Sequence, residues 1–161
     1  MRAIIDTGLQ VPENARIFDG TPAWVFTASD NQVKAQRLAD RNVQVVRMPL
    51  ENDRVHLPSV MRWLGEHEIN EVHIEAGSVL SGALLQAGCV DQLLVYTAPL
   101  LLGAGRPIAE LPVLQSLEQG LRFEFFDVAC VGADVRMLAR RSHAWRRLLD
   151  SVSVVPDSGQ Q

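Results

Sequence analysis

Short apolar runs alternate with segments of helical periodicity through the first half of the chain. Turn-forming residues bound each run, as they usually bound buried strands. The strands predicted in this way are residues 2–6, 23–27, 43–46 and 72–75. Two helices are expected between them, one capped by Ser29 or Asp30 and one with Pro58 in its first turn. Such alternation predicts a mostly parallel sheet with helices on both faces.

The rest of the chain is organised around residues 72–88, which read as a buried strand, a sharp turn and a helix. Gly77 is expected to make the turn, because glycine tolerates a positive φ without steric cost. From Ser78 onward apolar residues recur at helical spacing, and Gly88 is placed to end the helix.

The pattern changes after Gly88, where strands follow one another without helices. Residues 92–98, 121–128 and 134–139 are predicted strands, with a hairpin at Gly132 between the last two. We expect them to add antiparallel strands at one edge of the sheet. Residues 93–102 are apolar, so this edge is expected to pair with a second subunit.

Composition and charge narrow the function. The chain has 161 residues and a net charge of −4, which suits one globular domain and gives no basic face for nucleic acid or an anionic membrane. It has no signal-peptide pattern and no apolar run of the ~18 residues that a membrane span needs. Cys89 and Cys130 lie far apart, which argues against a zinc site or a disulfide scaffold and favours a cytoplasmic protein.

The start of the helix after Gly77 is the main candidate site. Unpaired amides there attract a phosphate or a carboxylate, and Glu75 lies beside them in the sequence. An ordinary β-α turn without a ligand explains the same residues about as well. Ligands in parallel sheets lie beyond the carboxyl ends of the strands. Glu75, Gly77 and Thr7 are expected at that edge, so their position favours a ligand site over an ordinary turn. Thr7 either contacts that ligand or only stabilises its own turn.

Other chemistries find less support. His73 and Glu75 have the spacing that opens a zinc-deaminase signature, but the chain lacks the Pro-Cys-x-x-Cys segment that completes it. We therefore expect no metal site. Ser78 and Ser81 have no evident base, so acyl-enzyme chemistry is not expected. If the site performs a reaction, a cofactor should carry the chemistry.

Three blocks of sequence resemble a known family. They are residues 4–7 (Ile-Ile-Asp-Thr), residues 72–91 with their Glu-Ala-Gly-Ser segment, and residues 96–103 with Ala-Pro-Leu-Leu-Leu-Gly. Together with residues 123–135, they are similar to the C-terminal reductase domain of the bacterial bifunctional riboflavin-biosynthesis deaminase/reductase. The resemblance covers residues 2–140, so we expect a reductase-like domain at 1–140. Residues 141–161 lie outside it and form a C-terminal tail, in which basic residues interleaved with Trp145, Leu148 and Leu149 favour a short amphipathic helix.

The resemblance implies a dihydrofolate-reductase-like α/β fold and a homodimer that uses NADPH. The implied reaction reduces the ribose of 5-amino-6-(5-phosphoribosylamino)uracil, a phosphorylated pyrimidine, to ribityl. Glu75 matches the family's substrate-contacting acid, and Thr7 matches a hydroxyl that touches the cofactor. The residues that match the cofactor-phosphate turn and helix are Gly77, Ser78, Val79, Leu80, Ser81, Gly82 and Ala83. No residue is singled out as catalytic.

The family's reductase domain normally begins earlier, so the resemblance implies a fold that lacks its usual first strands. The chain is then a fragment, a protein with a misassigned start, or a truncated relative. The alternative to an active reductase is a non-catalytic dimerisation or interaction module derived from it.

Overall fold

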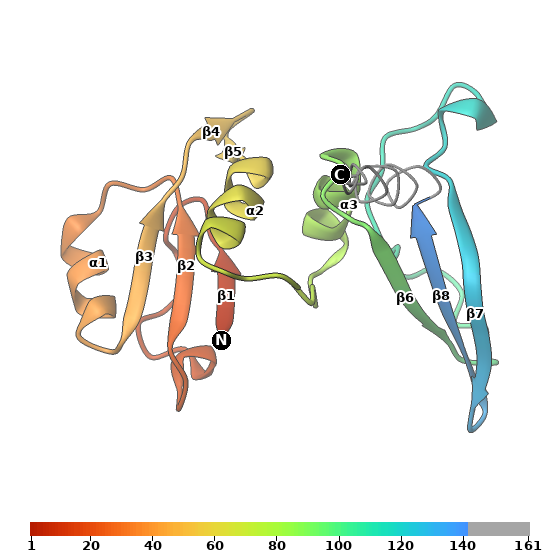
Figure 1. Ribbon diagram of the computed structural model, residues 1–161, viewed down its shortest axis with the longest axis horizontal. Coiled ribbons are helices and arrows are strands. Elements are labelled where there is room, and N and C mark those ends of the chain that lie inside the picture. The colour runs from red at the N-terminus through yellow and green to blue at the C-terminus, as the bar shows by residue number, and fades with distance from the viewer. Residues whose placement is uncertain (142–161) are drawn as a thin grey trace, which may run out of the picture. The chain divides into compact units, whose positions relative to one another are not determined.

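The computed structural model describes residues 1–141, which form two compact units that divide between His73 and Ile74. Unit 1 contains a parallel sheet with helices, and unit 2 contains one helix and an antiparallel sheet (Figure 1). The expected α/β class, a parallel sheet with helices and antiparallel C-terminal strands, is confirmed. The expected helix in the tail lies outside the described residues, apart from Arg141, which belongs to a strand.

Unit 1 is built on three parallel strands in the order β1-β2-β3, with β2 in the centre. The strands are β1 (Arg2–Ile5), β2 (Ala23–Thr27) and β3 (Val43–Arg47). Two helices accompany them, α1 (Gln32–Ala39) and α2 (Leu57–Glu66), with a short 3-10 turn at Arg16–Phe18. The register pairs Ile5 with Phe26 and Thr27 with Arg47, so the three carboxyl ends share one edge.

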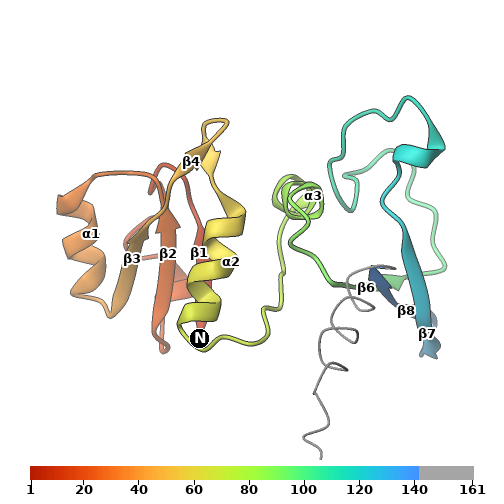
Figure 2. The same ribbon diagram turned by 45° about the horizontal axis from the view of Figure 1, so that its top comes forward.

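All five residues of β2 are buried, and the side chains of the first four alternate between two apolar clusters. Val25 packs in the cluster that holds Leu38 of α1. Phe26 packs in the cluster that holds Val60 and Leu64 of α2. The two helices therefore cover opposite faces of the sheet (Figure 2). On the α2 face the rings of Trp24 and Trp63 meet edge to face, with their centroids 4.9 Å apart.

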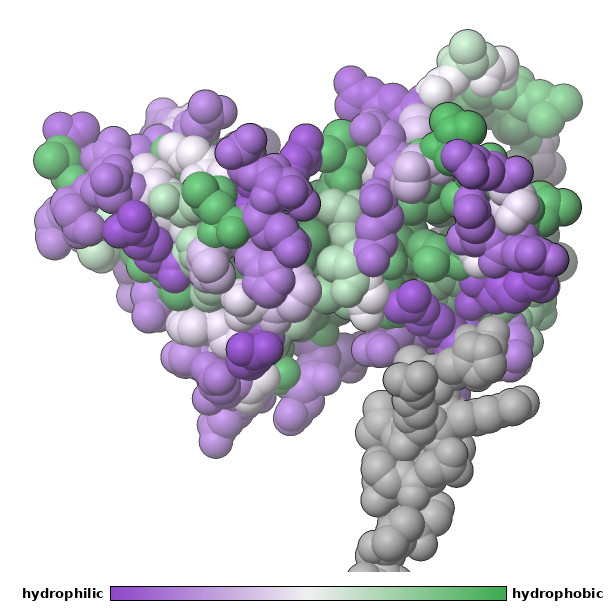
Figure 3. All heavy atoms as spheres, turned by 90° about the horizontal axis from the view of Figure 1, so that it is seen from above, coloured by the Kyte–Doolittle hydropathy of each residue, from purple (hydrophilic) through white to green (hydrophobic). Residues whose placement is uncertain are grey.

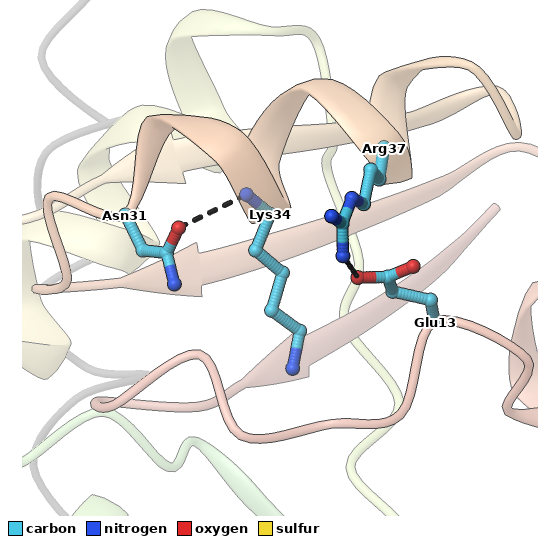
Figure 4. A network of polar contacts seen from close by, with 4 residues as sticks. All are labelled: Glu13, Asn31, Lys34 and Arg37. Atoms are coloured by element: carbon cyan, nitrogen blue, oxygen red, sulfur yellow. Dashed lines mark hydrogen bonds and ion pairs between the residues drawn. The ribbon is translucent and has the colours of Figure 1, made fainter.

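Helix α1 begins with a side-chain cap at Asn31, after both predicted positions, Ser29 and Asp30. The Asn31 Oδ1 atom accepts a hydrogen bond of 3.0 Å from the Lys34 N–H (Figure 4). The expected cap at Ser29 or Asp30 is wrong, because Ser29 Oγ accepts from the Asn31 N–H and so shapes the loop before the cap. One turn later, Arg37 pairs with Glu13 at 3.4 Å.

A two-stranded hairpin between β3 and α2 was not predicted. Its strands are β4 (Leu50–Glu51) and β5 (Arg54–Val55). The two turn residues, Asn52 and Asp53, have φ values of 49° and 59°. Two successive positive φ values are typical of the type I′ hairpin turn, which Asn and Asp tolerate better than most residues.

Unit 2 contains α3 (Ser78–Gln86) and three antiparallel strands in the order β6-β8-β7. The strands are β6 (Gln92–Thr97), β7 (Phe123–Val131) and β8 (Asp134–Arg141), and a 3-10 turn lies at Leu117–Gln119. Gly132 lies between β7 and β8 with a φ of 62°, as the predicted hairpin requires. These strands pair with one another in a sheet of their own, whereas we expected them to extend the parallel sheet.

The strand predicted at residues 72–75 is absent: residues 69–77 contain neither helix nor strand. Val72 is 40% exposed and Ile74 37%. The prediction failed because apolar composition gives a strand only where a neighbouring strand completes its hydrogen bonds, and none of the three described sheets includes this segment. The segment instead joins α2 to α3.

Candidate functional site

The carboxyl edge of the parallel sheet is held together by Thr7, the second residue after β1. Its carbonyl accepts hydrogen bonds from the Ala28 N–H and the Thr27 hydroxyl, both at 3.0 Å. Its hydroxyl accepts from the Val55 N–H at 3.3 Å. Thr7 thus fastens the ends of β1 and β2 to the hairpin, as the turn-stabilising alternative predicts. The same hydroxyl still has its own proton to donate.

A shallow hollow of about 370 Å³ lies at this edge, where β2 and β3 end. Four of its lining residues are Ala28, Met48, Pro49 and Leu50, and the fifth is Arg47, the last residue of β3. The backbone is fixed here, because the Met48 N–H donates to the Thr27 carbonyl at 2.7 Å. Sequence reasoning missed the hollow, since only Pro49, which ends the strand, stands out in the sequence.

Helix α3 begins at the predicted residue but not with the predicted turn. Gly77 is its N-cap, with a φ of −73° and a ψ of 170°, so the expected positive φ is wrong. An extended backbone is enough to enter the helix here, and a Cβ on Gly77 would meet no atom within 4 Å. The end of α3 does follow the prediction. Gly88 has a φ of 71°, and the Cys89 N–H donates to the Leu84 carbonyl at 3.0 Å.

The start of α3 has the properties of an anion-attracting helix end. Gly77 supplies no side-chain cap, and the first turn holds no acidic residue. The first amides of a helix have no partner inside the helix, so those of Ser78, Val79 and Leu80 are left for other acceptors. Ser81 is different, because its N–H donates to the Gly77 carbonyl at 3.0 Å.

Glu110 is bound to the first turn of α3, which sequence reasoning missed. The Ser78 hydroxyl donates to Glu110 Oε1 at 2.8 Å, and the Glu110 N–H donates to the Ser78 carbonyl at 2.9 Å. The Glu110 backbone then passes so close to Gly82 that a Cβ there would lie 1.9 Å from the Glu110 oxygen. Gly82 is therefore required for this close approach. No local spacing in the sequence links the two positions.

The predicted site residues divide between the two units. Thr7 belongs to unit 1, while Glu75 and residues 77–83 belong to unit 2. Glu75 is exposed and lies in the segment that leads into α3. Within α3, Ser78, Val79 and Leu80 share the first turn, and Ala83 follows the buried Gly82. In addition to the predicted Glu75, which precedes α3, Glu110 is a second acid at the start of this helix.

Cys89 is a free, partly buried cysteine just after α3. Burial raises the pKa of the Cys89 thiol, and the negative charge of Asp91 raises it further. A raised pKa keeps the thiol protonated and unreactive at neutral pH.

Residues 1–141 contain no group of three or more His, Cys, Asp or Glu side chains able to hold a metal ion. None of the helices described is long and apolar enough to cross a bilayer.

Comparison with known proteins gives a consistent family. The family model described as the RibD C-terminal domain matches residues 1–137. The riboflavin biosynthesis protein RibD of Escherichia coli K12 is 43% identical over 138 residues, which is 84% of this chain but 36% of that protein. The 5-amino-6-(5-phosphoribosylamino)uracil reductase of Buchnera aphidicola is 29% identical over 86% of this chain and 66% of its own length.

A solved structure agrees with these relatives. Acinetobacter baumannii RibD superimposes with a TM-score of 0.74 and 29% sequence identity, over 88% of this chain and 37% of that one. The chain thus spans little more than a third of the length of the RibD proteins that it matches.

Proposed function

Because the chain belongs to the RibD C-terminal domain family, we propose that it reduces 5-amino-6-(5-phosphoribosylamino)uracil with NADPH in riboflavin biosynthesis. The observation that carries the proposal is the family match over residues 1–137, together with a relative that is named for this reduction. The reduction of a ribose carbon needs a hydride donor, and no side chain supplies one. A nicotinamide cofactor, when bound, supplies the hydride.

The start of α3 fits the phosphates of such a cofactor. Its first amides have no side-chain cap, and no residue of the first turn itself is acidic, although the Glu110 carboxylate accepts from the Ser78 hydroxyl. Glu110 already binds the Ser78 hydroxyl, so we assign the phosphate contact chiefly to the amides of Val79 and Leu80. In this proposal the backbone of residues 77–83 binds phosphate, and the Thr7 hydroxyl donates its proton to the cofactor.

Glu75 is assigned to the substrate. It is an exposed acid in the segment that leads into α3, and it matches the acid with which this family contacts its substrate. A carboxylate is an acceptor for ribose hydroxyl and ring N–H groups, so Glu75 would orient the sugar and pyrimidine.

We also propose that the protein is a cytoplasmic homodimer. Among the described strands β6 pairs only with β8, so one of its edges is open. Leu94 and Tyr96 of this strand are 44% and 54% exposed, and Leu101 beyond it is 99% exposed. A second copy would cover apolar surface that is otherwise unfavourable in water. Light scattering of the full chain tests this, and a strictly monomeric protein would contradict it.

The cofactor assignment is tested by titrating the full chain with NADPH while following its fluorescence, and by measuring NADPH oxidation with and without the phosphoribosylaminouracil. We expect saturable binding, and oxidation only when the substrate is present. Val79→Glu places a negative charge in the first turn of α3 and should weaken NADPH binding about tenfold or more. The control is Val113→Glu, the same change at a side chain that is 97% exposed and lies outside the helix.

The outcomes separate two functions. A folded wild-type protein that binds no NADPH contradicts the reductase proposal and favours the non-catalytic dimerisation module. Equal binding by the Val79→Glu and Val113→Glu variants contradicts the assignment of phosphate to α3 but leaves the reaction itself in place.

A further inference from the structure

We propose that Glu110 competes with phosphate for the start of α3: its carboxylate holds the Ser78 hydroxyl and must leave before a phosphate takes its place. The inference rests on the proposed binding of phosphate at α3 and adds a residue that regulates this binding. It comes from contacts within unit 2 alone.

The Ser78 hydroxyl can serve only one acceptor at a time. It has a single proton, which it donates to Glu110 Oε1 at 2.8 Å. Ser78 is the first residue of α3, directly before Val79 and Leu80, whose amides are assigned to the phosphate. Glu110 therefore occupies a side-chain donor that a phosphate at this helix start would otherwise use.

The Glu110 carboxylate also places a negative charge beside the first turn of α3. The helix dipole favours a carboxylate at this end for the same reason that it favours a phosphate. Two anions close together repel each other, so a phosphate binds at full strength only after the carboxylate has moved away. The helix start thus attracts an acid from a connection of the chain that lies about 30 residues further on.

The Glu110 side chain can leave α3 while its backbone stays attached. The Glu110 N–H donates to the Ser78 carbonyl at 2.9 Å, and the Glu110 carbonyl accepts from Gln86 Nε2 at 3.5 Å. Neither bond involves the carboxylate, and the residue is exposed. Release therefore breaks one hydrogen bond between exposed groups, which contribute little net stability in water.

Other roles for the Glu110 carboxylate predict a different result when it is removed. If it bound a ribose hydroxyl of the ligand, its removal would weaken binding. If it only stabilised the first turn of α3, its removal would leave the affinity unchanged or lower it. Only competition with the ligand predicts that a variant without the carboxylate binds anions more tightly.

The test compares Glu110→Gln and Glu110→Ala with Glu118→Gln, the same loss of charge at an exposed acid of the same connection. Full-length wild type and the three variants are titrated with NADPH and with inorganic pyrophosphate, and thermal unfolding checks that all are folded. Glu110→Gln removes the charge but keeps an acceptor for Ser78, so it should bind both ligands about threefold to tenfold more tightly. Glu110→Ala also frees the Ser78 hydroxyl and should gain about a further threefold. Glu118→Gln should bind both ligands like the wild type.

The inference is overturned if Glu110→Gln binds pyrophosphate no more tightly than Glu118→Gln, or if it binds pyrophosphate more weakly than the wild type. The proposed function fails in a different way, through a wild-type protein that does not oxidise NADPH with the uracil substrate. In that case, tighter pyrophosphate binding by both Glu110 variants still supports the competition, and the absence of pyrophosphate binding to any of these proteins overturns it.

Discussion

The two units bury their apolar side chains to very different extents. In unit 1 the central strand β2 is buried throughout, and Val25 and Phe26 are completely inaccessible. Among the residues of unit 2 that the structure describes, Ala139 is the only buried strand residue, while Phe125 and Val128 of β7 are 66% and 59% exposed. Figure 3 shows the same contrast, with broad apolar areas over unit 2 and a mainly polar surface over unit 1.

This difference in burial reflects the type of each sheet. A parallel strand covered on both faces needs apolar side chains along its length, and the first four of the five residues of β2 have them. An antiparallel sheet can leave one face open, so its apolar side chains depend on what covers them. Unit 1 therefore has its own core, whereas the sheet of unit 2 leaves much of its apolar surface exposed.

The largest expected effect is the loss of a core ring. Phe26→Ala removes a fully buried side chain from the cluster on the α2 face, and should lower the free energy of unfolding by about 3–5 kcal/mol. Phe125→Ala, in unit 2, removes a ring that is 66% exposed and should cost less than about 1 kcal/mol in a monomer. Urea unfolding measures both, and equal losses would remove the contrast between the units.

The next effect compares two helical glycines. Gly82→Ala places a Cβ against the Glu110 backbone, so the loop must move and unfolding should become easier by about 1–3 kcal/mol. Gly65→Ala in α2 meets nothing within 4 Å and should stabilise its helix by about 0.5–1 kcal/mol. Thermal unfolding with opposite shifts for the two variants is the expected result, and shifts of the same sign contradict it.

A smaller effect separates the two helix starts. Asn31→Ala removes the cap of α1 and should cost about 1 kcal/mol. Gly77→Asn at the uncapped start of α3 should gain no more than a few tenths of a kcal/mol. Denaturant titration of both variants checks the signs. A loss at Gly77 as large as that at Asn31 would mean that α3 depends on its glycine.

The smallest effect is local to Cys89. Burial and the charge of Asp91 raise the pKa of the thiol. Its alkylation by iodoacetamide should therefore be slow at neutral pH and become faster as the pH approaches the raised pKa. Asp91→Asn removes only the second cause and should move the rate profile modestly to lower pH. Mass spectrometry of the modified peptide follows the rate, and a profile that is unchanged in the variant would assign the whole shift to burial.

Much of unit 1 could be predicted because its signals are local. The apolar run of β2, Pro58 in α2 and the alternation of strand and helix all act within a few residues. The antiparallel hairpin at Gly132 and the end of α3 at Gly88 were predictable for the same reason, since each needs a glycine at positive φ. The fold class followed from these elements.

The failures share a different cause, because each depends on distant partners. The segment at residues 72–75 has the composition of a strand but no neighbouring strand to pair with. The close approach of the Glu110 backbone to Gly82 joins positions 28 residues apart, so no local pattern displays it. The hollow beside Arg47 needs the ends of two strands at once, which no single stretch of sequence displays.

The hydrogen bonds between Glu110 and α3 divide the long connection between β6 and β7 into two parts. Residues 98–122 join β6 to β7 and contain only the short turn at Leu117–Gln119. Hydrogen bonds to Ser78 fix Glu110 near the middle, so the connection behaves as two short segments with a common anchor. Short closures cost less chain entropy than one long closure. Either segment can therefore gain or lose residues without changing the length that the other must span.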